Sequence, residues 1–498
     1  MSKTTSQTGI FAVILASSIG TLIEWYDFYI FGALEPIIAQ KFFPAGNPTL
    51  ATLAALATFA AGFLVRPFGA LVFGRLGDIV GRKYTFLLTL VLMGGSTFAI
   101  GCVPEYSSIG MAAPLLILLL RLVQGLAVGG EYGGAATYVS EHCDASKRGF
   151  YTSFIQTTAT LGLFLSLSVI YLIKMSIGAE AFFDWGWRLP FLISFFLVLI
   201  SIYIRMKMQE SPMFAKAKAE GKTTKKPLKE SFGKKANLKV VLLALFGATA
   251  GQGVVWYTGQ FYANAFVQKT MGVIDEQRIP LMLLAIVVAT PFFVVFGRLS
   301  DKIGRKWIMM FGILLAVCTY RPIYSTMLSM GDTSAKQEIV ANRLESSKTV
   351  LAENKIDSVQ TLSITKFYSD GTVYKEDTKT MLLADNSQAT ASKNKELTLS
   401  SANWWLLLFL IFIQIFYVTM VYGPIAAFLV ELFPTHIRYT SMSLPYHVGN
   451  GIFGGLTPFI ATALAVSGAL NGLWYPIIIG GITFIIGALF LSNKKSEE

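Results

Sequence analysis

Apolar runs of about twenty residues alternate with short charged patches along most of the chain. A run of this length, wound as an α-helix, crosses the roughly 30 Å hydrocarbon core of a bilayer. The alternation therefore predicts an all-α polytopic membrane protein with twelve transmembrane helices. These helices are expected at residues 10–39, 50–74, 84–104, 112–140, 150–174, 188–207, 238–268, 279–299, 306–329, 403–432, 439–467 and 472–492.

One polar stretch, residues 330–400, interrupts the pattern after the ninth run. Within it, "SITKFYSDGTVYKED" alternates apolar and polar residues around Asp370-Gly371, which is typical of a β-hairpin turn. Residues 335–352 are interpreted as a short amphipathic helix. The sequence predicts a small extracytoplasmic insert, and a disordered spacer remains the alternative.

Composition agrees with a membrane protein. Hydrophobic residues make up 54% and charged residues 14% of the chain, whereas soluble domains carry roughly a quarter charged residues. The three cysteines, Cys102, Cys143 and Cys318, lie in or beside apolar runs and are interpreted as small core residues. The first apolar run continues through Glu24 and Asp27 and is expected to be an uncleaved span.

The formal net charge of +12 comes mainly from residues that flank the spans. Lys and Arg accumulate after the second, sixth, eighth and twelfth runs, so the positive-inside rule places both termini in the cytoplasm. This placement argues against a nucleic-acid partner. Residues 208–238 are expected to form a basic cytoplasmic linker between a bundle at 1–207 and a second bundle at 239–329 and 401–498.

A charged phrase occurs twice: "GRLGDIVGRK" at 74–83 and "GRLSDKIGRK" at 297–306. It lacks the G-K-[ST] of a phosphate-binding loop. A Glu also precedes an Arg by seven residues after a span of each half, at Glu141 and Arg148 and at Glu431 and Arg438. These matched positions indicate two parallel repeats of six spans.

Both phrases resemble the loop signature of the major facilitator superfamily. The stretches "EWYDFYIFGAL", "RLVQGLAVGGEYGGAATYVSE", "WGWRLPF" and "ELFPTHIRYTSMS" further resemble its metabolite:proton symporters, which include permeases for α-ketoglutarate, citrate, shikimate and proline/betaine. The resemblance covers nearly the whole chain except 330–400. It implies two pseudo-symmetric six-helix bundles and two cytoplasmic gating charge clusters: Asp78, Arg82, Glu141 and Arg148, and Asp301, Arg305, Glu431 and Arg438.

Ionisable residues inside spans are costly, and each is a functional candidate. Glu24 and Asp27 are three residues apart and are expected to face one cavity. Resemblance to proton-coupled sugar porters implies that Asp27 carries the proton and that Arg121 is its partner. A static buried pair, or Glu24 as the carrier, are the alternatives. Glu131 is interpreted either as a proton relay or substrate contact, or as a structural tie.

Substrate contacts are expected from both halves near the midplane. Gln252, Trp256 and Gln260 follow i, i+4, i+8 and are expected to share a cavity-facing side, with close helix packing as the alternative. Arg66 is interpreted as either a carboxylate clamp or, preferably, a residue that snorkels to the interface. The substrate-binding candidates are Tyr26, Arg121, Gln124, Gln252, Trp256, Tyr257, Gln260 and Tyr417, followed by Tyr422, His447 and Asn450.

The sequence thus predicts a monomeric secondary transporter of the bacterial cytoplasmic (inner) membrane, which imports a small organic acid by proton symport. It needs no metal, no cofactor beyond the coupling proton, and has no nucleophile–base constellation typical of an enzyme. The expected partners are the substrate, protons and the lipid bilayer. A proton-coupled proline/betaine symporter is the first alternative, because Trp256 and the tyrosines suit a quaternary ammonium group. A transporter-like membrane sensor is the second.

Overall fold

The computed structural model describes residues 7–43, 48–79, 82–130, 132–207, 227–334, 336–351, 358–382, 388–433 and 437–492. The chain forms two compact units, and each is considered by itself. The first unit comprises Met1–Tyr262, Ile286–Tyr320 and Gln414–Glu498. The second unit comprises Ala263–Ala285 and Arg321–Ile413.

The expected twelve-span helical fold is confirmed. Among the described residues, ten helices are long and apolar enough to cross a membrane, and they coincide with ten of the twelve predicted runs. Helices α1 and α5 occupy the first and third predicted runs. The first half contains α1 (Gln7–Ala33), α2 (Glu35–Phe42), α3 (Pro48–Leu64), α4 (Arg66–Ile79), α5 (Arg82–Cys102), α6 (Tyr106–Ile109), α7 (Ala112–Gly129), α8 (Tyr132–Glu141), η1 (Ala145–Lys147), α9 (Arg148–Ile177), α10 (Ala179–Asp184), η2 (Gly186–Arg188) and α11 (Leu189–Lys207).

The second half repeats the helical pattern, but its first span is irregular. That span alternates α-helix with three π-helical segments, each of which holds an extra residue per turn. Most of the predicted linker, residues 208–226, lies outside the described part of the chain. The elements are α13 (Pro227–Phe232), α14 (Lys235–Ala244), η3 (Leu245–Thr249), α15 (Ala250–Tyr257), η4 (Thr258–Tyr262), α16 (Ala263–Ala265), η5 (Phe266–Thr270), α17 (Asp275–Ala289), α18 (Pro291–Ile303), α19 (Arg305–Gly331), α20 (Ser401–Tyr422), α21 (Ile425–Leu432), α22 (Arg438–His447), η7 (Val448–Gly454), α23 (Thr457–Ala465), η8 (Asn471–Leu473) and α24 (Trp474–Phe490).

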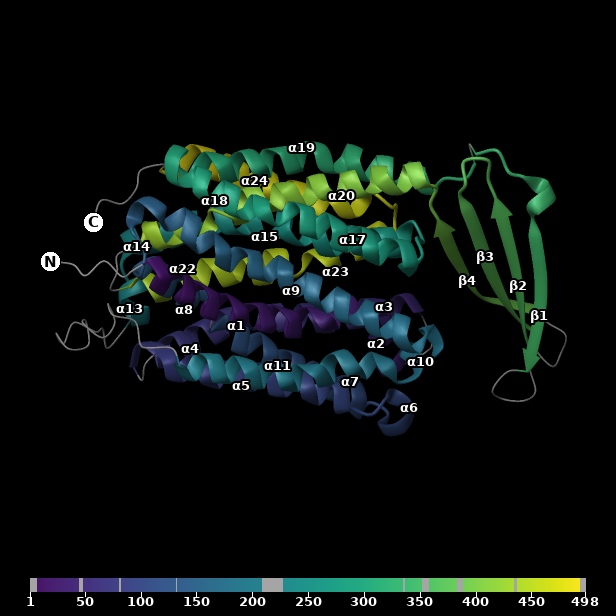
Figure 1. Cartoon of the computed structure of the whole chain (residues 1–498), viewed down its shortest axis with the longest axis horizontal. Helices are drawn as coiled ribbons and strands as arrows, with labels where there is room; N and C mark the ends of the chain where they lie inside the picture. The colour runs from purple at the N-terminus through teal and green to yellow at the C-terminus, as the bar shows by residue number, and fades with distance from the viewer. Residues whose placement is uncertain are drawn as a thin grey trace. The chain divides into compact units, whose positions relative to one another are not determined.

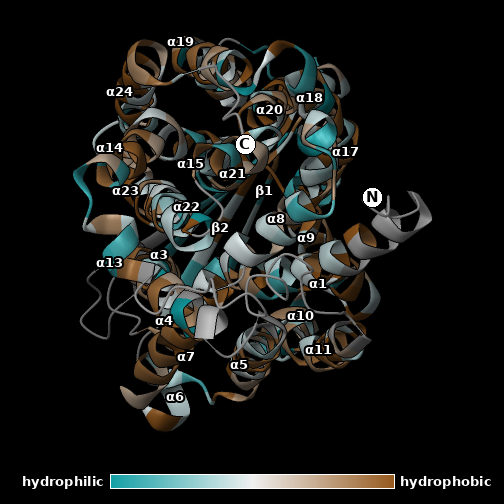
Figure 2. Cartoon of the chain, turned by 90° about the vertical axis from the view of Figure 1, so that its left-hand side faces the viewer, coloured by the Kyte–Doolittle hydropathy of each residue, from teal (hydrophilic) through white to brown (hydrophobic). Residues whose placement is uncertain are grey.

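In the first unit the long helices run side by side, and α1 begins at the same end of the bundle where α24 finishes (Figure 1). Peripheral helices such as α7, α11 and α24 show hydrophobic outer faces in the end-on view of Figure 2. Large apolar side chains on these faces, including Leu119, Phe196 and Leu489, are more than half exposed. An apolar exterior around a core that contains buried charges is the arrangement expected for a protein solvated by lipid.

Close helix contacts join the two halves within this unit. Helix α9 of the first half packs on α18 of the second, and Gly149 and Gly297 lie at the crossing. A Cβ atom at either glycine would collide with the opposite helix. Glycine at both positions therefore lets the two backbones approach closely at the site where the halves meet.

The second unit contains the insert, a four-stranded antiparallel meander with strand order β1-β2-β3-β4. The predicted turn at Asp370-Gly371 is present between β2 and β3, with Gly371 at a φ of 85°. The amphipathic helix predicted for 335–352 is wrong. Pairing with β2 overrides the local helical pattern, so only η6 (Val340–Asn342) is a helical turn before β1 begins at Leu344. The strands are β1 (Leu344–Leu351), β2 (Ser358–Phe367), β3 (Val373–Leu382) and β4 (Gln388–Thr398).

Two backbone hydrogen bonds fasten the end of β4 to the loop that precedes α17. The Leu397 N–H donates to the Gly272 carbonyl at 2.7 Å, and the Ile274 N–H donates to the Leu397 carbonyl at 3.1 Å. The Gln277 side chain adds a reciprocal pair with the backbone of Leu399, at 3.0 and 2.7 Å. The described residues of the insert therefore form a folded part of its unit rather than a spacer.

Candidate functional site

Arg66 is the first residue of α4 and lies inside the bundle with no exposed surface. Its guanidinium carbon is 4.2 Å from the ring centroids of both Phe28 and Phe63, and 5.2 Å from that of Trp25. None of its three guanidinium nitrogens has a hydrogen-bond acceptor among the described residues. The expectation that Arg66 snorkels to the interface is therefore wrong. The span is interrupted between α3 and α4, and Arg66 and Pro67 begin α4 directly after this interruption.

Arg121 on α7 is the second fully buried guanidinium. It donates to the Gln124 side-chain oxygen at 2.7 Å, and to the backbone carbonyls of Phe28 and Phe59 at 3.3 and 3.4 Å. Gln124 in turn donates to the Thr97 hydroxyl at 2.7 Å. Gln124 therefore orients Arg121, and both the oxygen and the nitrogen of its amide group are engaged in these hydrogen bonds.

We call the two arginines and the rings around them the guanidinium cage. Each guanidinium carbon lies 4.2 Å from the centroid of the Phe28 ring, so the two charges are separated by no more than twice that distance. At an effective dielectric constant of 20, they repel each other by at least about 2 kcal/mol. The salt bridges found among the described residues include neither arginine. The rings of the cage are Trp25, Phe28, Phe31, Phe59 and Phe63.

The second half contributes further groups at the cage. Trp256 of α15 stacks on Tyr29 with ring centroids 5.4 Å apart, and Tyr29 stacks on Trp25 at 5.0 Å. Tyr257 packs edge-on against Phe63 at 5.1 Å and lies beside Arg66. The Trp256 indole N–H has no acceptor among the described residues. Donor groups thus outnumber acceptors at this site, which suits a negatively charged ligand.

His447 of α22 adds another polar group, because it is fully buried and lies within electrostatic range of Arg66. Neither of its ring nitrogens has a partner within the described part of the chain. Tyr422 and Tyr446 share a hydrogen bond at 2.7 Å, and Tyr446 stacks on Tyr132 of the first half at 3.5 Å. These aromatic residues close the bundle between the two halves.

The predicted stripe of Gln252, Trp256 and Gln260 does not share one face. Gln252 and Trp256 lie in α15, whereas Gln260 lies in the π-helical segment η4. The wider turn of a π-helix changes the direction of the Gln260 side chain. Gln252 exchanges two amide hydrogen bonds with Asn450, at 2.9 and 2.8 Å, inside the second half. Gln260 instead reaches the first half and donates to the Thr160 hydroxyl at 3.3 Å. Trp256 is the member of the three that stacks on a ring of α1, that of Tyr29.

Two other substrate candidates lie away from the cage. The Tyr26 hydroxyl donates to the Pro190 carbonyl at 2.7 Å, which ties α1 to the start of α11. The Tyr417 hydroxyl accepts from Thr319 at 3.2 Å on the neighbouring α19. Each of these hydroxyl groups therefore links two neighbouring helices.

Asp27 is fully buried, and neither of its carboxyl oxygens has a hydrogen-bond partner among the described residues. The Ser194 hydroxyl of α11 lies beside it. The expected contact with Arg121 is not formed in this structure. Successive helical side chains point about 100° apart, so Phe28 faces the cage while Asp27 faces α11.

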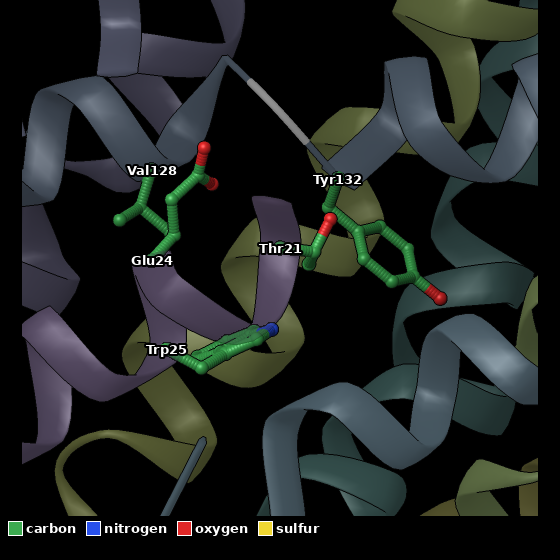
Figure 3. A pocket seen from close by; sticks show the side chains of 5 residues that line it. All are labelled: Thr21, Glu24, Trp25, Val128 and Tyr132. Carbon is green, nitrogen blue, oxygen red and sulfur yellow. The ribbon is translucent and has the colours of Figure 1, made fainter. Parts of the chain in front are cut away.

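Glu24 was expected to share a cavity with Asp27, but the two carboxyls point to different places. Glu24 lines a small pocket with Thr21, Trp25, Val128 and Tyr132. Figure 3 shows Glu24 and Val128 facing Tyr132 across this pocket, with Trp25 at its base. Glu131, the other acidic candidate, lies outside the described residues.

A charged cluster, here called the latch, connects the halves at one end of the bundle. Both carboxyl oxygens of Asp301 accept backbone N–H groups at the start of α9, from Gly149 and Phe150, each at 2.8 Å. Arg305 bridges Asp301 and Glu431 at 2.9 Å to each. Helix N-termini carry unpaired N–H groups and partial positive charge, so Asp301 caps α9 with its full charge.

One contact of the latch joins residues that the family resemblance assigned to different charge clusters. Arg148 of the first half lies 3.7 Å from Glu431 of the second half. Arg438 donates from its Nε to the Phe433 carbonyl at 3.1 Å. The side chains of Asp78 and Arg82 lie outside the described part of the structure.

This fold is found in solved transporters. The proton:xylose symporter XylE bound to 6-bromo-6-deoxy-D-glucose matches with a TM-score of 0.71 and 15% identity, over 99% of this chain and 98% of that chain. The inward-open xylose transporter XylE from Escherichia coli matches with a TM-score of 0.60 and 17% identity, over 98% of each. The protein thus has the fold of these solved transporters.

Sequence comparison identifies the branch. A family model described as sugar (and other) transporter matches residues 12–241. The inner membrane metabolite transport protein YhjE of Escherichia coli is 31% identical over 496 residues, covering 98% of this chain and 94% of its own. The alpha-ketoglutarate permease of Escherichia coli is 31% identical over 97% of this chain and 94% of its own. The proline/betaine transporter of Salmonella typhimurium is 35% identical over 64% of this chain and 65% of its own. The chain belongs to this family of metabolite transporters within the major facilitator superfamily.

Proposed function

We propose that the protein imports an organic acid anion together with protons by alternating access. The observation that supports this substrate class is the pair of fully buried guanidiniums that have no carboxylate partner among the described residues. A buried charge without a partner is costly by several kcal/mol. An anion that binds between Arg66 and Arg121 offsets this cost, and the similarity to an alpha-ketoglutarate permease agrees with an acidic substrate.

Asp27 is the proposed proton carrier. A fully buried carboxyl that is not paired with a cation is most stable in its protonated, neutral form. Asp27 directly precedes Phe28, whose ring and carbonyl both contact Arg121, so a movement of α1 displaces the acid and the guanidinium together. Protonation of Asp27 compensates the charge of an incoming anion. Glu24 is the alternative carrier, because it lines a pocket of its own.

The latch is the proposed cytoplasmic gate. The charge pattern of the loops supports a cytoplasmic position for this end and for both termini. The proposed working form is a monomer in the bacterial inner membrane. Opening of this end requires that Asp301 release the start of α9 and that Arg148 part from Glu431. The cage is sealed from solvent at the same time, since both arginines are fully buried.

Proline or betaine transport is the second candidate. The stack of Trp25, Tyr29 and Trp256 offers aromatic faces that attract a quaternary ammonium group. The proline/betaine transporters are among the similar sequences. Arg66 lies over the Trp25 ring and repels such a group, which favours the acid.

Uptake into proteoliposomes tests the proposal. A panel of labelled organic acids, amino acids and betaines is offered with and without an inward proton gradient. Gradient-dependent accumulation of an organic acid is expected, with Arg66→Gln raising its KM at least about a hundredfold, since a lost charge pair costs about 3 kcal/mol or more. Arg75→Gln, at an exposed position, is the matched control. Accumulation of betaine alone contradicts the acid assignment, and a sensor accumulates nothing.

A further inference from the structure

Among the described residues, Phe28 is the ring that lies under both buried guanidiniums. Arg66 lies over Phe28, Phe63 and Trp25, whereas Arg121 lies over Phe28, Phe31 and Phe59. The two guanidinium carbons are equally distant from the Phe28 centroid, at 4.2 Å. Contact with this shared ring keeps the two positive charges within twice that distance of each other.

Phe28 is itself held rigidly. Its side chain has no exposed surface, and its ring packs edge-on against Phe63 at 4.5 Å and at a tilt against Phe59 at 5.7 Å. Its carbonyl accepts a hydrogen bond from Arg121. A packed aromatic ring has few accessible rotamers, so the spacing of the two cations is a fixed property of the site.

The two arginines differ in how many of their guanidinium nitrogens lack a hydrogen-bond acceptor among the described residues. Arg121 has already used its Nη atoms on Gln124 and two carbonyls, and only its Nε has no partner, whereas all three nitrogens of Arg66 are available. A carboxylate bound to Arg66 satisfies that guanidinium with charge-assisted hydrogen bonds. A single carboxylate leaves the net charge of Arg121 uncompensated, and a second carboxylate on the same molecule neutralises it.

We infer that Phe28 is a specificity-determining residue that sets the spacing between two carboxylate subsites, so that the substrate is a short dicarboxylate of one preferred chain length. The inference rests on the proposed transport of an organic acid and adds the number and spacing of its charged groups. Arg66 provides the principal subsite, and Arg121 provides the second through its charge and its remaining N–H. Phe28 is not itself a ligand for either carboxylate.

A homologous series of inhibitors tests the wild-type protein in proteoliposomes. Malonate, succinate, glutarate and adipate compete with the labelled organic acid, beside the monocarboxylates of equal length. One dicarboxylate length is expected to inhibit best, and at least about tenfold better than its monocarboxylate. Equal inhibition by mono- and dicarboxylates overturns the inference while leaving organic acid transport intact. If no organic acid is transported, the proposed function itself fails, and these two outcomes are distinct.

Variants test the assignment to Phe28. Phe28→Leu keeps the site apolar but removes the shared ring, so the preferred length is expected to shift or the preference to fall at least about threefold. Phe31→Leu is the matched control. Of the two guanidiniums in the cage, the Phe31 ring contacts that of Arg121, at 4.6 Å. It is expected to weaken binding without changing the preferred length. An unchanged length profile in Phe28→Leu, or the same shift in Phe31→Leu, overturns the assignment. The wild-type series keeps the inference testable if Phe28→Leu does not fold.

Discussion

The contact of Asp301 with the start of α9 offers the sharpest test of the latch. Asp301→Asn retains one acceptor oxygen but places an amide donor against one of two backbone N–H donors, of Gly149 and Phe150, that now lie 2.8 Å from the carboxylate. It also removes the negative charge that pairs with Arg305 at 2.9 Å. The variant should therefore weaken the closed arrangement of this end specifically.

The magnitude follows from these contacts. A hydrogen bond to a charged group contributes about 1.5–3 kcal/mol, and a carboxylate at a helix N-terminus adds about 0.3–1 kcal/mol. The loss of one bond and of the charge thus shifts the closed–open equilibrium by about 2–4 kcal/mol, or roughly thirtyfold or more. The Asp301 side chain is only 7% exposed, so solvent screening reduces this value little.

Labelling of a cysteine measures the shift. Ser443→Cys, in a background where Cys102, Cys143 and Cys318 are replaced by serine, places a thiol at a buried position opposite Gly133 of the other half. A membrane-impermeant maleimide applied from the latch side should react at least about tenfold faster when Asp301→Asn is added.

Asp144→Asn is the control, since Asp144 is an exposed acid close to the same end. It should leave the labelling rate unchanged. An unchanged rate in a folded Asp301→Asn protein would refute the role given to the latch, and an equal increase in both variants would show that net charge alone determines the rate.

Three further outcomes are expected. Asp27→Asn should abolish gradient-driven accumulation while counterflow exchange stays measurable, and unchanged accumulation would exclude Asp27 as the proton carrier. Gln124→Leu should raise the KM about tenfold, because Arg121 loses its 2.7 Å acceptor, without changing the proton dependence of uptake; an unaltered KM would contradict the orienting role of Gln124. Burial alone would raise the pKa of Asp370 in the insert, but hydrogen bonds from Thr372 and Lys336 outweigh it and lower this pKa. Because the folded pKa is the lower one, the stabilisation is present above the ordinary aspartate pKa of about 3.9 and is lost as the pH falls below it. Proteolysis of the insert should accordingly accelerate in that acidic range in the wild type, and this pH dependence should be weaker in Asp370→Asn.

Local sequence patterns predicted much of the architecture. The twelve spans followed from run length, because the thickness of a bilayer fixes the length of an apolar helix. The turn at Asp370-Gly371 followed from residue types that tolerate its backbone angles. The strand at Leu344–Leu351 did not follow, because its pairing with β2 is a non-local interaction that overrides a weak helical pattern.

The candidate site was predicted less well, and the reasons are geometric. Helical periodicity placed Gln252, Trp256 and Gln260 on one face, but a π-helical segment turned Gln260 away. Glu24 and Asp27 are three residues apart on one helix, which predicted a shared cavity. The neighbouring helices instead give each carboxyl a different environment. The Pro that follows Arg66 was a usable signal for an arginine at a break inside a span.

The sequence by itself determined that this is a membrane protein with two related halves, because burial in lipid and the charge of the loops act on composition and length alone. Only the tertiary structure decided which charges meet. It brought Arg66 and Arg121 into contact with one phenyl ring, left Asp27 without a contact to Arg121, and connected Asp301 to a helix of the other half. Such contacts depend on how helices distant in sequence cross and rotate, and no local pattern encodes those angles.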